Sequence, residues 1–298
     1  MSSFNDLFQQ ETAQPVSQNY RPFDKEVWKQ QKQEQRETVY SLIDDTAEAL
    51  AQGSVLFQSY LDVQSRFDRY SVANALLILA QKPNATRIAD FDTWKEQGIY
   101  IRKKESGFYI LEPEEYQRED GTTGISYNPK KMFDIAQTGN NHNRETPSYP
   151  DERTRIKALM AHAPVPIRIN DTLPEGVNAL YRPEEREIQI QRGMNADNIF
   201  RSLSQELAHA EMDKGNGSYN RSDNAFHAYC VSYMLCKQYG VDTTGYRFDR
   251  APLMLDGMEG QEIRAKLSVI REAAGEISGR MNRMLAQQRL QKRQEPER

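Results

Sequence analysis

Apolar residues recur at helical spacing over most of this chain, and only short stretches alternate at the spacing of strands. The i, i+3, i+4, i+7 pattern of a helix with one buried face is met between residues 71 and 80, at Ala73, Leu76, Leu77 and Ala80. Strand-like patterns are confined to short segments within residues 98–136 and 165–191. Many helices with two small groups of strands predict an α+β fold.

The expected elements fall into two groups. The first contains helices at 24–52, 55–67 and 71–80, a hairpin of 98–102 and 107–111 around a turn at 103–106, an acidic loop at 112–124 and short strands at 125–127 and 132–136. The second contains a helix at 153–161, strands at 165–169, 179–181 and 187–191, and helices at 196–214, 222–239 and 259–291. We therefore expect N-terminal helices with a small antiparallel sheet, then a helix-rich domain with a small sheet of its own.

Composition also predicts where the domains end. Residues 1–22 lack a sustained apolar period and contain repeated Gln and Ser, which predicts a disordered arm. Residues 139–150 are rich in Asn and Pro, which predicts a linker. The expected domains are therefore 23–138 and 151–298.

The charge and cysteine content exclude several classes of protein. The chain has 39 basic and 43 acidic residues, a net charge of -4. No stretch approaches the ~18 apolar residues of a membrane span, and the first residues lack the features of a signal peptide. Two cysteines, Cys230 and Cys236, are too few for a secreted disulfide framework and are expected to be buried thiols. A cytoplasmic protein without a membrane partner is predicted.

A basic segment lies within this acidic chain. Residues 66–104 contain eight basic and four acidic residues, a local charge of +4, interleaved with the aromatic residues Phe67, Tyr70, Phe91, Trp94 and Tyr100. Basic residues can neutralise phosphates, and aromatic faces can stack on unpaired bases. The same aromatic residues could belong to the core, so composition alone leaves nucleic-acid binding open.

The order of several motifs resembles the N-terminal domain of ArdC-type antirestriction proteins, a family encoded on plasmids and conjugative elements. The motifs are Arg69-Tyr70-Ser71-Val72-Ala73-Asn74, Gln81-Lys82-Pro83-Asn84-Ala85-Thr86, Phe91-Asp92-Thr93-Trp94, Lys103-Lys104-Glu105-Ser106-Gly107 and Met132-Phe133-Asp134-Ile135-Ala136. The resemblance spans residues of about 24 to 140 and implies binding of single-stranded DNA. The matching positions with chemistry to offer are Arg69, Tyr70, Ser71, Asn74, Thr86, Trp94, Lys103 and Lys104. For Tyr70 and Trp94, packing in the core is an equal alternative.

A second motif follows the spacing of a zinc peptidase. Such enzymes read His-Glu-x-x-His, in which the histidines hold zinc and the glutamate polarises its water. Here the segment reads Gln205-Glu206-Leu207-Ala208-His209, with a neutral amide at the first ligand position. Zinc prefers nitrogen and sulfur ligands, so Gln205 is a poor replacement. Glu206 is the catalytic candidate of this motif.

The second half of the chain also resembles the zincin-like domain of ArdC proteins and their shorter LtrC-like relatives. The matching features are residues 200–203, the motif itself and the helical segment 228–236. The resemblance implies an acidic third ligand on the downstream helix, where this sequence has Tyr229. The metal positions are then Gln205, His209 and Tyr229, and the site is expected to be degenerate. A relocated site that adds Asp223 and His227 remains an alternative.

These features predict a single-stranded DNA-binding protein of a plasmid or conjugative element, with an antirestriction or DNA-transfer role and a degenerate metallopeptidase-like domain. No cofactor is expected, or zinc if the metal site is intact. One alternative is an active zinc peptidase with a non-standard ligand set. Another is a non-catalytic module that binds a restriction or conjugation protein.

Overall fold

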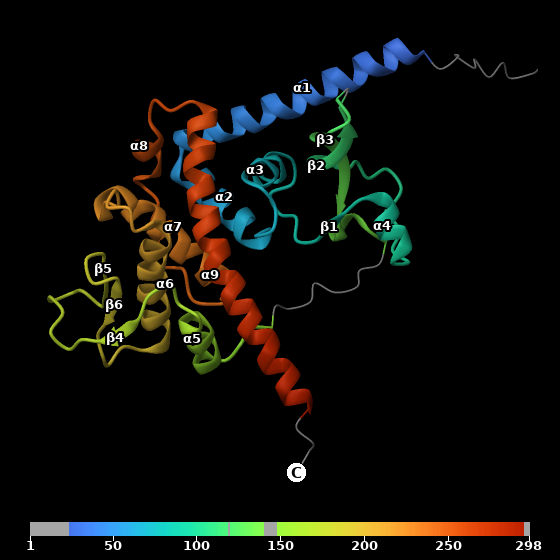
Figure 1. Cartoon of the computed structure of the whole chain (residues 1–298). Helices are drawn as coiled ribbons and strands as arrows, with labels where there is room; N and C mark the ends of the chain where they lie inside the picture. The colour runs from blue at the N-terminus through green and yellow to red at the C-terminus, as the bar shows by residue number, and fades with distance from the viewer. Residues whose placement is uncertain (1–23, 119, 140–147, 295–298) are drawn as a thin grey trace, which may run out of the picture.

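The computed structural model describes residues 24–118, 120–139 and 148–294, so the predicted arm at 1–22 and most of the predicted linker lie outside the described residues. The first half contains α1 (Lys25–Ala49), η2 (Leu50–Gln52), α2 (Ser54–Arg66), α3 (Val72–Gln81), β1 (Ile88–Ala89), α4 (Phe91–Glu96), β2 (Phe108–Gln117), β3 (Thr123–Asp134) and η3 (Ile135–Gln137). The second contains α5 (Glu152–Met160), β4 (Ile167–Ile169), β5 (Ala179–Arg182), β6 (Glu187–Ile190), α6 (Ala196–Met212), α7 (Arg221–Tyr239), α8 (Ala251–Leu255) and α9 (Gly260–Gln294). The α+β prediction is confirmed (Figure 1).

Short polar side chains start several of these helices. Asp24 accepts hydrogen bonds from the second and third amides of α1, and Asn220 does the same for α7. Asn195 accepts from the third amide of α6, the N–H of Asn198. Such caps satisfy backbone N–H groups that have no partner within the helix. The caps of α6 and α7 set where the two helices of the candidate metal site begin.

The first sheet is antiparallel, in the order β1-β3-β2. The predicted hairpin of 98–102 and 107–111 is wrong, because Ile101 forms only an isolated bridge to Thr138 and residues 108–117 pair with 123–134. The predicted acidic loop at 112–124 is largely strand. Its charged side chains fit a strand because the outer part of this two-stranded ribbon is exposed to solvent.

Helix α3 covers the free edge of β2. The side-chain amide of Asn74 donates to the carbonyl of Leu111 at 2.9 Å and accepts from its N–H at 2.7 Å. Gln81 makes the same pair of bonds with Tyr109, at 2.8 and 2.9 Å. Two amides on one helix thus replace a neighbouring strand, and Pro113 has no N–H to offer further along this edge.

The second sheet is small and mixed. Strand β6 lies between β4, which is parallel to it, and β5, which is antiparallel. Strand β5 lies against α6. This contact places the backbone of Tyr181 beside the motif helix.

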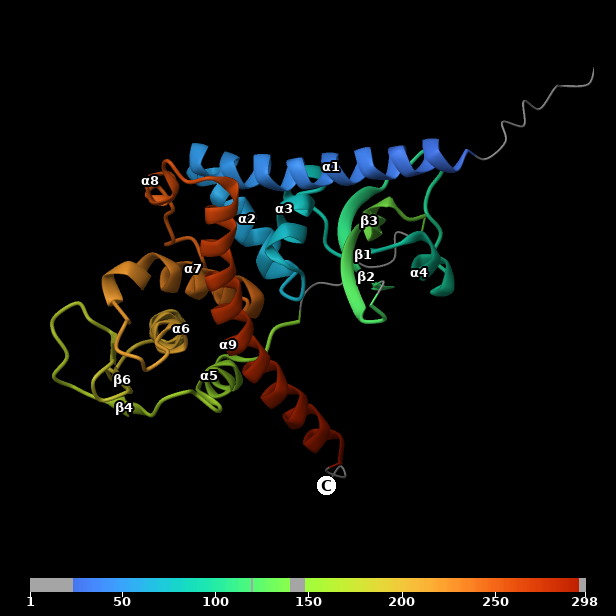
Figure 2. The same ribbon diagram turned by 45° about the horizontal axis from the view of Figure 1, so that its top comes forward.

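The helices of the two halves share one continuous core. Helix α9 packs against α1 and α3 as well as α5, α6 and α7, and α2 packs against α7 (Figures 1 and 2). Polar contacts reinforce this packing: Arg271 donates to the carbonyl of Tyr70 at 2.8 Å, and Tyr233 donates to Asp62 at 2.7 Å. The division at residues 139–150 stays a prediction, but the two halves are in extensive contact.

Two further expectations concern the core and membranes. Cys230 and Cys236 are both free and buried, as predicted. Within the described ranges, no helix is both long and apolar enough to cross a membrane.

Candidate nucleic-acid interface and candidate metal centre

Lys103 and Lys104 occupy the two central positions of a tight turn. The N–H of Glu105 donates to the carbonyl of Arg102 at 3.3 Å, and Lys104 has a φ of 68°, a left-handed conformation that is uncommon for a residue other than glycine. The Arg102 guanidinium contacts Oε1 of Glu105 at 3.1 and 2.5 Å and lowers the pKa of that carboxyl, while Gln137 donates to Oε2 at 3.1 Å. The base of the turn is therefore held in place while both lysine side chains are exposed.

Two exposed aromatic residues lie on segments next to this turn in the sequence. Phe91 begins α4 and is 54% exposed, and Tyr100 is 70% exposed. Backbone bonds from Ile99 to Trp94 and from Gly139 to Tyr100 hold this segment against α4 and the end of η3. Phe91 and Tyr100 belong to the aromatic set noted in the sequence, but they match no residue among the eight resembled DNA-binding positions.

Trp94 is a core residue. Its side chain is completely buried, and its indole N–H donates to the carbonyl of Phe133 at 2.9 Å. The guanidinium of Arg87 lies 5.0 Å from the centre of its ring. Of the two alternatives for Trp94, packing is therefore correct.

Asn74 is likewise not available to DNA. Its amide makes both of its bonds to Leu111 and its side chain is buried, which corrects the expectation of a base contact. Ser71 is exposed but caps α3, where its hydroxyl accepts from the N–H of Asn74 at 3.2 Å. Both residues position α3 against the sheet.

The remaining predicted positions are more accessible. Arg69 and Thr86 are exposed, and Tyr70 is half-buried with its ring edge-on to Phe67. Burial, followed by the charge of Glu112, raises the pKa of Tyr70. Arg69, Thr86, Lys103 and Lys104 thus remain free to meet a ligand.

In the candidate metal centre, Glu206 has both carboxylate oxygens occupied. They accept from the two terminal nitrogens of Arg221, each at 2.7 Å, and Oε2 also accepts from the N–H of Tyr181 at 2.7 Å. The Glu206 side chain is only 5% exposed. Arg221 belongs to no recognised motif, so nothing in the sequence indicated that it would contact this glutamate.

His209 is completely buried on the same helix. Its Nδ1 lies 2.7 Å from the hydroxyl of Tyr219, and its Nε2 has no partner among the described atoms. Burial, followed by the charge of Arg221, lowers the pKa of His209 to about 3, so the imidazole is neutral at pH 7. A free Nε2 with a bonded Nδ1 is the arrangement of a metal-ligating histidine.

Gln205 and Tyr229 line the same cavities. Both line two neighbouring cavities of about 330 and 510 Å³ between α6, α7 and residues 242–254. The hydroxyl of Tyr229 accepts from the N–H of Arg247 at 2.7 Å. The structure thus brings an amide and a phenol together, and His209 is not among the residues that line either cavity.

The relocated site is wrong. His227 lines a separate small pocket between α7, α8 and α9, where burial and then Lys266 lower its pKa. Asp223 is exposed, and it does not line the cavities of Gln205.

Taken together, the side chains do not fit a metal ion. His209 Nε2 is suitable, but Glu206 is committed to Arg221 and the other two positions lack imidazole or carboxylate groups. Across the residues that the structure describes, no group of three or more His, Cys, Asp or Glu side chains is placed to hold a metal. Among the motif positions, the Nε2 of His209 is thus the one metal ligand of the usual kind, and the degeneracy of the site stays a prediction.

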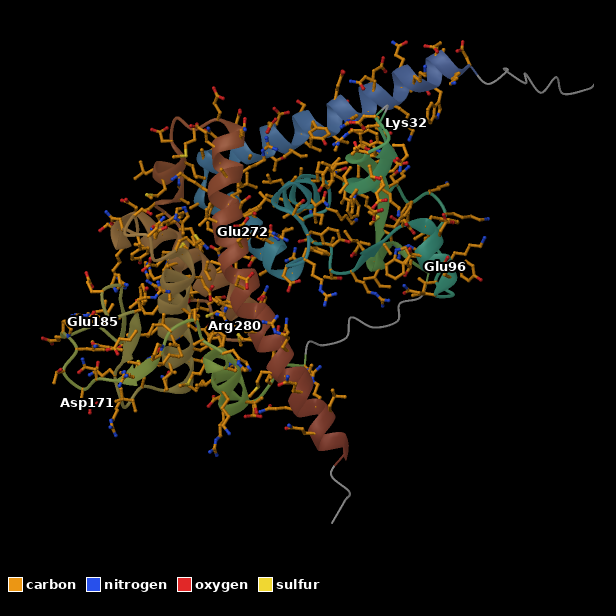
Figure 3. All side chains as sticks on the ribbon, in the orientation of Figure 1. Lys32, Glu96, Asp171, Glu185, Glu272 and Arg280 are labelled. Carbon is orange, nitrogen blue, oxygen red and sulfur yellow. The ribbon has the colours of Figure 1, made fainter. Side chains whose placement is uncertain are left out.

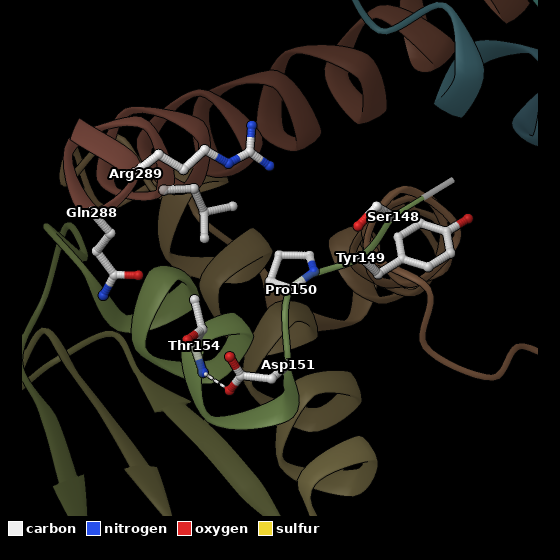
Figure 4. Close-up of a pocket in the computed structure, with 8 residues that line it drawn as sticks. Ser148, Tyr149, Pro150, Asp151, Thr154, Gln288 and Arg289 are labelled. Atoms are coloured by element: carbon white, nitrogen blue, oxygen red, sulfur yellow. Dashed lines mark hydrogen bonds between the residues drawn. The ribbon is translucent and has the colours of Figure 1, made fainter. Parts of the chain in front are cut away.

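A further cavity of about 250 Å³ lies between the start of α5 and the end of α9 (Figure 4). Asp151 caps α5 there by accepting from the N–H of Thr154 at 2.9 Å. The guanidinium of Arg289 reaches over this cavity from α9. None of the predicted site residues lines it.

Comparison with known proteins finds a family match that covers most of the first half of the chain. Residues 33–156 match the family described as the N-terminal domain of anti-restriction factor ArdC. The Mn(II)-bound structure of the antirestriction protein ArdC from plasmid R388 is 16% identical, with 82% of this chain and 97% of that chain covered and a TM-score of 0.50. The metal-free structure is 18% identical over 72% and 86% of the two chains, with a TM-score of 0.47. No curated protein matches the sequence.

Proposed function

We propose that this is an ArdC-type antirestriction protein of a plasmid or conjugative element that binds single-stranded DNA in the cytoplasm, because residues 33–156 match the ArdC N-terminal domain family. The observation that carries the proposal is the turn that exposes Lys103 and Lys104, close in sequence to the exposed rings of Phe91 and Tyr100. A role in DNA transfer would use the same surface.

Charge supports this surface as the phosphate-binding part of the site. The whole chain is acidic, whereas residues 66–104 carry a local charge of +4. Arg66, Arg69, Arg87 and Lys95 are exposed in this segment in addition to the two lysines of the turn. Since each phosphate contact releases counterions, the affinity should fall steeply as salt is added.

The exposed aromatic rings favour single-stranded over duplex DNA. A ring can stack on a base only where the base is not already stacked between its neighbours, and such stacking tolerates any sequence. Phe91 and Tyr100 have the exposure that this role needs, whereas Trp94 does not. The proposed interface therefore contains Arg69, Thr86, Phe91, Tyr100, Lys103 and Lys104.

The test is a pair of double variants with equal charge loss. Lys103→Ala with Lys104→Ala should weaken binding of a fluorescent oligonucleotide of mixed sequence and reduce the slope of log affinity against log salt by about 1.4, since each lost contact to a single strand contributes about 0.7. The control is Lys25→Ala with Lys32→Ala, which removes the same charge from exposed positions of α1 outside residues 66–104 (Lys32 is labelled in Figure 3). Equal losses in both variants would remove the turn from the interface.

We also propose that the second half is zincin-like in fold but does not hydrolyse peptides. Gln205 and the commitment of Glu206 to Arg221 support this proposal, because a zinc hydrolase needs three protein ligands and a free carboxylate. The related ArdC structure is Mn(II)-bound, so metal content after dialysis is the direct test. One equivalent of zinc or manganese, lost on His209→Ala, would favour an active metalloenzyme instead. Binding of a restriction or conjugation protein by this half is the remaining alternative.

A further inference from the structure

Arg221 brings a positive charge to the place where a metal ion would be sought. Its guanidinium contacts Glu206, which stands at the catalytic position of the motif, through two bonds of 2.7 Å. It also interacts with the hydroxyl of Tyr219, and that hydroxyl lies 2.7 Å from Nδ1 of His209. The cation thus lies beside two of the motif residues at once.

We propose that Arg221 is a resident cation that replaces the metal ion of this motif, so that the second half of the chain is held together without metal. The inference deepens the proposed absence of peptide hydrolysis and does not depend on DNA binding. It explains why the glutamate is present although the first histidine is not: the carboxylate now has a structural partner.

The chemistry of the pair supports this role. A carboxylate as buried as Glu206 needs a counter-charge and further hydrogen bonds, which the fork of Arg221 and the N–H of Tyr181 provide. A guanidinium keeps its charge at every physiological pH. A second cation held by His209 would be repelled by the charge of Arg221, and the other two motif positions, Gln205 and Tyr229, offer an amide and a phenol in place of imidazole and carboxylate.

The experiment restores the ligands with and without Arg221. The variant Gln205→His with Tyr229→Glu is stripped with EDTA, dialysed and titrated with Zn(II) by calorimetry, alone and combined with Arg221→Ser. Removal of Arg221 should tighten Zn(II) binding at least tenfold, because it removes the competing charge and frees Glu206. Equal affinity in the two variants would overturn the inference.

A second measurement uses the full chain without restored ligands. Its melting temperature should not change on treatment with EDTA or on addition of Mn(II) or Zn(II). Arg221→Met should lower the melting temperature by roughly 5 °C or more, Arg221→Lys should lower it less, and Arg182→Met, which breaks an exposed pair with Glu185, should leave it unchanged. A melting temperature that falls with EDTA, or is unchanged in Arg221→Met, would contradict the inference. If Arg221→Met does not fold, the Arg221→Lys variant and the Zn(II) titration decide the question.

Discussion

Both carboxylate oxygens of Glu206 lie 2.7 Å from terminal nitrogens of Arg221, and this ion pair joins two helices and a strand. Glu206 lies on α6, Arg221 is the first residue of α7, and the N–H of Tyr181 on β5 completes the contacts of the carboxylate. In a zinc peptidase the glutamate at this position acts on the metal-bound water, whereas here Glu206 links α6 to the start of α7 and to β5.

The first prediction concerns how much the Glu206–Arg221 ion pair contributes to stability. Glu206→Gln should lower the free energy of unfolding by about 3 kcal/mol, because it leaves the partly buried Arg221 without its counter-charge. Urea unfolding at pH 7 measures the loss. Glu185→Gln removes the exposed partner of Arg182 and should change the stability by less than about 1 kcal/mol. If Glu206→Gln lowers the free energy of unfolding no more than Glu185→Gln does, the Glu206–Arg221 pair is not needed for stability.

A second prediction separates structure from DNA contact at Asn74. Asn74→Leu should lower the free energy of unfolding by about 2 to 4 kcal/mol, since the buried N–H and carbonyl of Leu111 lose their only partners on that edge. The affinity of the folded variant for single-stranded DNA should not change. Gln81→Leu removes the equivalent pair of bonds to Tyr109 and is the matched comparison. It should also lower the free energy of unfolding without changing the affinity for DNA. If Asn74→Leu weakens DNA binding while its stability is unchanged, a base contact is the better account.

The sequence predicted the helices and the fold class because these depend on local periodicity. The apolar stripe of residues 73–80 is such a case, and α3 forms there. The clamp between Asn74 and Leu111 could not be predicted, because it joins an amide to a strand 37 residues away. The pairing of Arg221 with Glu206 has the same cause: it depends on how α7 starts relative to α6.

Exposure explains the other difference between prediction and structure. Residues 112–117 carry several carboxylates, which suggested a loop, yet they continue β2 on a ribbon that is exposed to solvent. The sequence also does not reveal which aromatic side chains are exposed: Trp94 is fully buried, whereas Tyr100 is 70% exposed. Aromatic residues in a basic segment show which residues can stack on bases, and only the fold shows which of them are free to do so.

The third prediction tests the exposed rings. Phe91→Ala and Tyr100→Ala should each weaken binding of single-stranded DNA by about 1 to 3 kcal/mol, a factor of roughly 5 to 150, while leaving the melting temperature nearly unchanged. Tyr116→Ala is the control, since Tyr116 is 47% exposed on β2 but lies outside the basic segment. Fluorescence anisotropy with an oligonucleotide at fixed salt gives the affinities. Affinities equal to that of the control would leave binding to the basic residues alone.

The last prediction concerns the acid sensitivity of the α4 start. Hydrogen bonding to Lys130 at 2.5 Å, followed by the cap bond from Thr93, lowers the pKa of Asp90 from 3.8 to about 2. Because the folded-state pKa is the lower one, the stabilisation is fully present above pH 3.8 and is lost as the pH falls through about 2. Asp90→Asn keeps a good cap but removes the charge, so it should lower the free energy of unfolding by at most about 2 kcal/mol at pH 7.

At pH 2.5 the difference in free energy of unfolding between the parent chain and Asp90→Asn should be less than half its value at pH 7. At that pH the Asp90 carboxyl is largely protonated in the unfolded chain and partly protonated in the folded one. Urea unfolding of both proteins at the two pH values measures the change. Lys130 also contacts Glu112 at 2.8 Å, and this second partner keeps part of its charge compensated when Asp90 is replaced. Asp92→Asn, at an exposed position of α4, is the control. A difference that stays constant from pH 7 to 2.5 would mean that the Asp90 carboxylate stabilises the fold through its cap geometry and not through its charge.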